Sequence, residues 1–196
     1  MKNSTILLLL LLCNHVIAQD VIQTKAGNKI EATEGSIWID SKNKHVLYKL
    51  PNVKKRKKIK FKDVVSASYK DHQFQTFDVN GKSKGFLILV DANDKRLGAI
   101  STNRTVSKGG FEVPYTRYEL AVIDNSGKVL QYLVFTDVNN PNNIAMRKVA
   151  GEIVRNNFQD CPNLLERLKT FENTDLKSVN GDIAELIAEL YLISCK

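Results

Sequence analysis

The sequence predicts an α+β protein, in which an antiparallel β-rich N-terminal part, a sheet or a barrel, is followed by about three C-terminal helices. Short β-branched and aromatic segments alternate with Gly- and Asn-containing turns as far as about residue 138, with no helical segment between them. Near Asn140 the apolar period changes from two residues to 3.6. A hydrophobic content of 43% with only four prolines is typical of a globular chain.

The expected strands share alternating, β-branched or aromatic composition, and they cover residues 20–24, 29–40, 45–50, 59–61, 64–69, 74–79, 86–90, 96–100, 118–123 and 129–135. Asn80-Gly81 and the segment 124–127 carry strong turn signals between two pairs of these strands. Because consecutive strands follow one another through short turns, we expect them to pair antiparallel.

Three helices are expected after the strands. Asn140 can cap the first, with Pro141 at its first position. Its apolar face comprises Met146, Val149, Ala150, Ile153, Val154 and Phe158. Asp160 is expected to cap a second helix with Pro162 in its first turn, and a third is expected over residues 182–194.

The first eighteen residues have the layout of a secretory signal peptide. Lys2 supplies a positive start, residues 6–13 are an apolar run, and the small residue Ala18 suits signal peptidase, which makes Gln19 the expected new N-terminus. The apolar run is much shorter than the roughly 20 residues of a membrane span. A lipoprotein signal acylated at Cys13 is disfavoured because Leu12, rather than a small residue, precedes it. We therefore expect a periplasmic or secreted protein.

Charge divides the remaining chain. Residues 19–110 carry 19 Lys and Arg against 9 Asp and Glu, whereas residues 111–196 carry 9 against 12, within a total net charge of +8. The expected organisation is therefore a signal peptide over residues 1–18, a basic β-rich domain over 19–138, and a helical tail over 139–196 packed on it.

Cys161 and Cys195 are the two cysteines that remain after removal of the signal peptide. Export places them in an oxidising compartment, and antiparallel packing of the tail helices would bring the two ends together. A disulfide is favoured over a free reactive thiol or a metal-binding pair.

Three segments carry a resemblance: residues 20–30, Tyr48-Lys49, and the tail from Cys161-Pro162-Asn163-Leu164 to Cys195. In these segments the chain resembles small exported proteins of Bacteroidota. The resemblance implies an exported α+β protein, and it assigns no activity to any residue.

Residues 81–85, Gly-Lys-Ser-Lys-Gly, match the G-x-S-x-G pattern of a serine hydrolase. That site requires a helix directly after the serine and a histidine later in the chain. Here a strand is expected after Ser83, and no histidine follows it. A phosphate-binding loop is excluded as well, because Thr76 stands where its first glycine belongs. The segment is expected to be a hairpin turn flanked by lysines.

The sequence offers few candidate residues for a metal site or for acid–base catalysis. His45 and His72, with one carboxylate, could form a metal site, but histidines on a solvated strand face are the simpler interpretation. Glu185 and Glu189 lie one turn apart in the expected third helix and fit a solvated helix face better than a catalytic pair. No catalytic residue, metal or cofactor is predicted.

The most distinctive segment is the basic run, residues 54–62. Seven of its nine residues are basic: Lys54, Lys55, Arg56, Lys57, Lys58, Lys60 and Lys62. Ile59 and Phe61 are expected to face the core, which places Lys58, Lys60 and Lys62 on the other face. These residues either protect a sheet edge from aggregation or bind a polyanion such as acidic polysaccharide, lipid phosphate or nucleic acid.

The sequence thus predicts a non-catalytic exported protein of the cell envelope that binds or scaffolds. Two alternatives stay open. An envelope enzyme without a recognisable motif would show a deep pocket with His45 or His72 beside a carboxylate. A subunit of a larger envelope assembly would expose an apolar patch.

Overall fold

The structure is a computed structural model that describes residues 20–92, 94–138, 140–173 and 195. These residues form β1 (Val21–Thr24), β2 (Lys29–Glu31), β3 (Trp38–Asp40), β4 (His45–Tyr48), β5 (Lys57–Lys60), the 3-10 helix η1 (Phe61–Asp63), β6 (Val64–Tyr69), β7 (His72–Val79), β8 (Lys82–Asp91), β9 (Lys95–Lys108), β10 (Phe111–Asp124), β11 (Val129–Thr136), α1 (Pro141–Asn157) and α2 (Pro162–Asn173). The predicted order of strands before helices is confirmed. Two α-helices are described instead of about three, and both the third one, expected over residues 182–194, and the signal peptide lie outside the described residues.

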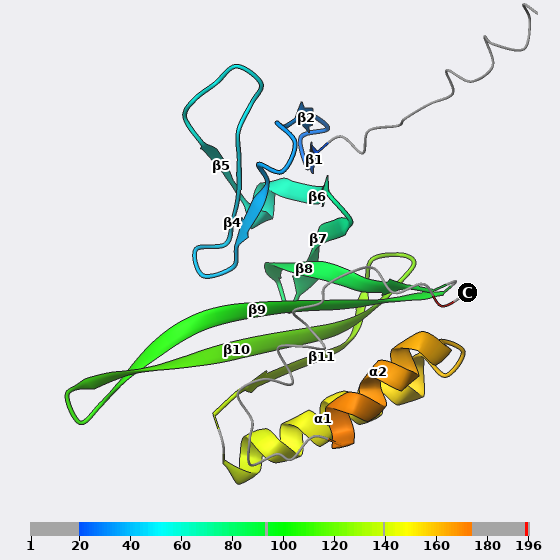
Figure 1. Ribbon diagram of the computed structural model, residues 1–196. Coiled ribbons are helices and arrows are strands. Elements are labelled where there is room, and N and C mark those ends of the chain that lie inside the picture. Colours follow the sequence, from blue (N-terminus) through cyan, green and yellow to red (C-terminus); the bar gives the residue numbers. More distant parts are fainter. Residues whose placement is uncertain (1–19, 93, 139, 174–194, 196) are drawn as a thin grey trace, which may run out of the picture.

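Two antiparallel sheets organise the β-rich part (Figure 1). The larger one has the strand order β11-β10-β9-β8-β7-β6-β1-β2, and the smaller one has the order β3-β4-β5. Of the two predicted arrangements, the open sheet is therefore the one observed, with β11 and β2 at its two edges. Nearly every pairing joins strands that are neighbours in the sequence, as short hairpin connections require.

The turn signals in the sequence mark real hairpins. Asn80 and Gly81 adopt φ angles of 53° and 73° between β7 and β8, and Gly127 adopts 87° between β10 and β11. Tight hairpin turns need such left-handed backbone, in the two-residue Asn80-Gly81 turn as in the longer turn that contains Gly127, and Asn and Gly adopt it at low cost.

The single strand expected over residues 29–40 is wrong. The chain forms β2, turns at residues 33–36, and then forms β3, which belongs to the other sheet. Gly35 has a φ of 67°, and the Ser36 amide donates to the Thr33 carbonyl across 3.0 Å. This turn carries the chain from one sheet to the next.

The strands β9 and β10 are much longer than the segments 96–100 and 118–123 that the sequence predicted. They pair without interruption from Asp124↔Lys95 to Phe111↔Lys108, and Gly109 and Gly110, with φ of 59° and 84°, form the turn. Residues 103–115, here called the arm, extend past the strands β8 and β11 that flank the hairpin (Figure 1). The sequence hides the arm because its residues are mostly polar and Pro114 interrupts the pattern.

The larger sheet is covered on both faces, by the helices on one and by the smaller sheet on the other (Figure 1). The core under the helices joins sheet residues to helix residues: Leu89, Val90, Leu97, Ala99, Tyr118, Leu120, Val122, Phe135, Ala150, Val154, Phe158, Cys161, Leu164 and Leu168. The core on the other face includes Ile22, Val46, Tyr48, Phe61, Val64, Phe74, Phe77, Phe86, Ile88, Ile100, Ala121 and Ile123. Along β10, even-numbered residues therefore face the helices and odd-numbered ones face the smaller sheet.

The first helix begins as predicted. The Asn140 side chain accepts from the Asn143 amide across 2.9 Å, and Pro141 occupies the first turn. Met146, expected on the buried face, is instead 36% exposed. The second helix begins at Pro162, so the residue before it is Cys161 and not Asp160. A proline fits the first helical position because its missing N–H has no partner there, and this sets the cap one residue later than predicted.

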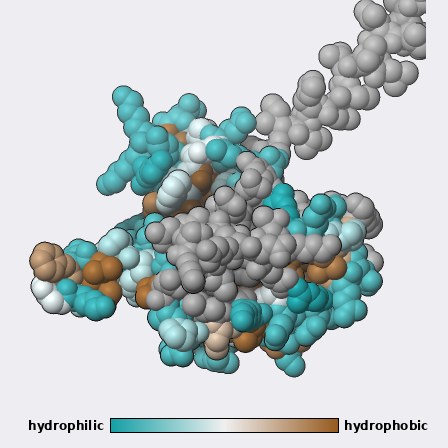
Figure 2. Space-filling view, turned by 60° about the horizontal axis from the view of Figure 1, so that its bottom comes forward, coloured by the Kyte–Doolittle hydropathy of each residue, from teal (hydrophilic) through white to brown (hydrophobic). Residues whose placement is uncertain are grey.

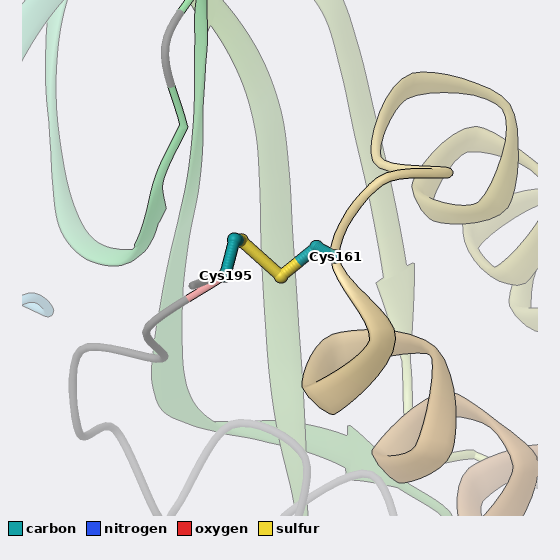
Figure 3. The surroundings of a disulfide bond; sticks show 2 residues. All are labelled: Cys161 and Cys195. Carbon is teal, nitrogen blue, oxygen red and sulfur yellow. A yellow bond between two sulfur atoms is a disulfide. The ribbon is translucent and has the colours of Figure 1, made fainter.

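The predicted disulfide is present between Cys161 and Cys195 (Figure 3). Their Cα atoms lie 4.4 Å apart, and the two residues are separated by 34 positions in the sequence. Cys161 is 2% exposed and belongs to the core beneath the helices, against which Cys195 also packs. The bond therefore ties the C-terminal end of the chain to the start of α2.

Candidate functional site

The basic run lies in the smaller sheet. Residues 54–56 belong to the β4–β5 connection, Lys57, Lys58 and Lys60 lie on β5, and Lys62 lies in η1. All seven basic side chains are exposed, whereas Phe61 is 3% exposed and packs in the core. The prediction that Ile59 and Phe61 face the core is confirmed, with Phe61 buried and Ile59 partly buried against the same core.

The strand β5 fixes the spacing of two lysines. In the register, Lys58 pairs with Leu47 and Lys60 pairs with His45, while Ile59 pairs with the buried Val46. Lys58 and Lys60 therefore share one face, about 7 Å apart along the strand. Lys62 does not continue that face as predicted, because β5 ends at Lys60 and the chain turns into η1 so that Phe61 can reach the core.

No ion pair neutralises the basic run within the described part of the chain. The acidic groups that form ion pairs there are Glu31, Asp94 and Glu119, and their partners lie outside residues 54–62. The strand β5 is also an edge of its sheet. This placement suits both interpretations of the run, because lysines on an edge oppose strand addition and uncompensated cations attract anions.

The two histidines lie in different sheets. His45 is on β4 of the smaller sheet, and His72 is on β7 of the larger one, where its ring lies 5.4 Å from that of Tyr69. Among the described residues, no group of three His, Cys, Asp or Glu side chains is placed to hold a metal ion. The paired Glu185 and Glu189 lie outside the described residues.

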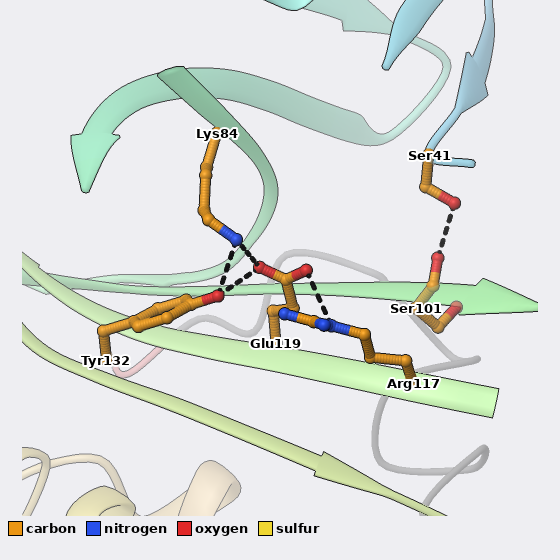
Figure 4. A network of polar contacts seen from close by, with 6 residues as sticks. All are labelled: Ser41, Lys84, Ser101, Arg117, Glu119 and Tyr132. Atoms are coloured by element: carbon orange, nitrogen blue, oxygen red, sulfur yellow. Dashed lines mark hydrogen bonds and ion pairs between the residues drawn. The ribbon is translucent and has the colours of Figure 1, made fainter. Parts of the chain in front are cut away.

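A polar network that the sequence analysis missed lies between the two sheets (Figure 4). Glu119 on β10 accepts from the Lys84 ammonium, at 2.5 Å, and from the Tyr132 hydroxyl, and its other oxygen lies 3.2 Å from Arg117 Nε. The Lys84 ammonium also lies 5.0 Å from the centre of the Tyr132 ring. The side chains of Lys84 and Glu119 are only 20% and 14% exposed, so this is a largely buried ion pair.

The proton affinities within this network keep its charges fixed. Burial opposes ionisation of Glu119, but the hydrogen bonds from Lys84 and Tyr132 outweigh it, and the pKa of Glu119 lies below its usual value. Burial likewise opposes the charge on Lys84, yet its bonds to Glu119 and Tyr132 raise its pKa. Burial, and then the bond to Glu119, raise the pKa of Tyr132. Near neutral pH none of the three is poised to exchange a proton, as acid–base catalysis would require.

A small depression adjoins the network, with a volume of about 290 Å³ that includes its part open to solvent. It is lined by Ser41, Lys44, Phe61, Ser83, Lys84, Gly85, Ile100, Thr102 and Glu119. Neither His45 nor His72 reaches it, so it lacks the pairing that we expected of an enzyme. The Ser41 hydroxyl donates to the Ser101 carbonyl across 2.7 Å, which fastens the β3–β4 turn to the base of the arm (Figure 4).

Ser83 lies on β8, not on a turn that enters a helix, so the hydrolase pattern at residues 81–85 has no structural counterpart. The hairpin turn itself is confined to Asn80-Gly81, and residues 82–85 are strand. Gly85 is required for packing: a Cβ atom there would lie 2.2 Å from the Phe74 ring.

One feature of the sequence points to the polar network around Glu119. Glu119 interrupts the apolar alternation of residues 118–123, which marks a carboxylate that must find a partner when the strand is buried. That partner, Lys84, is 35 residues away, and only the pairing of β8, β9 and β10 brings the two together.

No protein-family model, curated protein or solved structure matches this chain. Among the described residues, no helix is long and apolar enough to cross a bilayer.

Proposed function

We propose that this protein is a non-catalytic, exported protein of the cell envelope that binds polyanions through the basic run. Export rests on the signal-peptide layout of residues 1–18, and the resemblance to small exported proteins of Bacteroidota agrees with it. The observation that carries the binding proposal is the exposure of seven cationic side chains, none of which forms an ion pair with a described acidic residue.

Close spacing makes these charges act together. Residues 54–58 are five consecutive basic residues, and the last of them, Lys58, lies about 7 Å from Lys60 on the same face of β5. That spacing is below the Debye length of about 10 Å at 0.1 M salt, so the fields of neighbouring charges add. A flexible anionic polymer or a layer of phosphate groups can match such a cluster without specific contacts.

Retention on immobilised heparin tests the proposal. Replacing Lys54, Lys55, Lys57 and Lys58 by serine should lower the salt concentration of elution, whereas the thermal midpoint should hardly change, because exposed charges contribute little to folding. The variant should elute at lower salt because it attracts heparin less strongly, so less salt is needed to screen the attraction.

A matched control separates local field from net charge. Serine at the exposed positions Lys25, Lys82, Lys128 and Lys148 removes the same four charges from scattered sites. The proposal predicts that this variant elutes near wild type. If both variants shift equally, net charge alone explains retention, and if neither shifts, the basic run only protects a sheet edge.

A further inference from the structure

The arm has two chemically different faces. In the register of β9 and β10, the rungs Lys108–Phe111, Val106–Val113 and Arg104–Tyr115 alternate with rungs made of Ser107–Glu112, Thr105–Pro114 and Asn103–Thr116. Because directly paired residues share a face, the first set forms one face, apolar and cationic, and the second set forms the other. Thus the only acidic residue of the arm, Glu112, lies opposite the apolar face.

The apolar face is left open to solvent at the tip of the arm. Phe111 is 77% exposed, Val106 is 48% exposed and Val113 is 43% exposed. Figure 2 shows the arm projecting from the body of the molecule with hydrophobic surface at its end. Exposed large apolar side chains that cluster at a projecting tip mark an interaction site more often than scattered ones do.

We infer that the arm binds the interface of an anionic lipid bilayer, with Phe111, Val106 and Val113 inserted between the lipids. The inference adds a second site, since the arm shares no residue with the basic run. It does not depend on the proposed function, because the arm carries its own cations.

Dimensions support this occupant. Successive rungs on one face are about 7 Å apart, so Phe111 and the Val106–Val113 pair occupy the last 7 Å or so of the arm. Interfacial elements bury their apolar side chains about 5–10 Å deep, between the headgroups and the acyl chains. The next rung, Arg104–Tyr115, then falls at the level of the headgroups, where a guanidinium pairs with phosphate and a tyrosine lies at the boundary with water.

The same features disfavour a protein partner. A stable protein interface needs about 800 Å² from each side, and three side chains at the end of a two-stranded ribbon do not supply that area. A second copy of this face would also bring a second Arg104 and Lys108 onto the same small surface, where the like charges repel. An anionic lipid surface complements both cations, because Arg104 lies at the level of the headgroups and the long side chain of Lys108, which shares the rung of Phe111, can extend back toward the phosphates. Each cation is worth roughly 1 kcal/mol of attraction near such a surface.

The test uses the chain from Gln19 onwards, which retains every described strand and helix and lacks the apolar run at residues 6–13. Binding is measured by co-sedimentation with vesicles of phosphatidylcholine, with and without phosphatidylglycerol. Replacing Phe111 and Val113 by serine should weaken binding to the anionic vesicles about tenfold or more. Val65→Ser is the matched control, because Val65 has the same exposed fraction as Val113, 43%, and lies on β6 away from the arm.

Fluorescence reports the insertion directly. Trp38 is the single tryptophan, so Phe111→Trp combined with Trp38→Phe places the only indole at the tip. Anionic vesicles should shift its emission to the blue, and lipids brominated on their acyl chains should quench it. Unchanged emission, or equal vesicle binding by the Phe111/Val113 variant and wild type, overturns the inference.

Two further measurements distinguish the lipid inference from dimerisation through the tip and from polyanion binding by the basic run. If sedimentation velocity shows that wild type is a dimer and the Phe111/Val113 variant a monomer, the tip binds a second copy and the lipid inference is wrong. Heparin retention of the tip variant should equal that of wild type, because the basic run is intact. A loss of vesicle binding together with retained heparin binding therefore separates the arm from the proposed polyanion site.

Discussion

Removing the disulfide should lower the free energy of unfolding by about 4 kcal/mol. The chain-entropy relation for a closed loop gives this value at 25 °C for the 34-residue separation of Cys161 and Cys195. For a chain of this size, each 1 kcal/mol corresponds to roughly 2–4 °C in the thermal midpoint, so the midpoint should fall by about 8–16 °C. The effect acts through the unfolded chain, which gains freedom when the link is absent.

Two variants distinguish the bond from the packing of its sulfur atoms. Cys195→Ala breaks the link but leaves the buried Cys161 in the core with α2, whereas Cys161→Ala combined with Cys195→Ala also removes that contact. The single variant should therefore show most of the loss. Urea unfolding followed by circular dichroism measures both. A single variant within about 0.5 kcal/mol of wild type refutes the loop-entropy reasoning, and two free thiols in denatured, unreduced protein from Gln19 onwards refute the bond itself.

The remaining predictions concern the buried network and export. Glu119→Gln leaves the Lys84 charge largely buried without its counter-ion, and urea unfolding at pH 7 should show a loss of about 1–3 kcal/mol. Because the pKa of Glu119 is lowered in the folded state, its contribution is present above about pH 4.5 and is lost as the pH falls further. Wild type and variant should therefore converge in stability as the pH falls through the lowered pKa of Glu119, and a constant difference would contradict the assigned ionisation. Intact mass of the exported protein should give an N-terminus at Gln19, and acylated Cys13 would instead make it a lipoprotein.

Local chemistry made the hairpins and the first helix predictable. Asn80-Gly81 suits a left-handed turn whatever surrounds it, and Asn140-Pro141 caps and starts a helix through contacts within four residues. The disulfide was predictable for a different reason, because two cysteines that remain after the expected removal of a signal peptide favour a disulfide over a free thiol.

Features that depend on distant pairing were not predictable. In the arm, polar residues and glycines separate the few apolar ones, each strand is held by one partner strand, and Pro114 argues against a strand when it is considered alone. Lys84 has the sequence context of a turn lysine, and only the sheet order places it beside Glu119. In the same way, the exposure of Met146 follows from where α1 meets the sheet and not from its helical period.

The uninterrupted register of β9 and β10 fixes the direction in which the side chains at the tip of the arm point. A slip of one residue at the tip would propagate along all the pairs between Phe111 and Asp124 and would rotate Tyr118, Leu120 and Val122 away from the helices. The core therefore prevents the slip. The orientation of Phe111 and Val113 is thus set by side chains far inside the molecule, and sequence changes at the outer rungs can alter the chemistry of the tip without altering the direction in which it points.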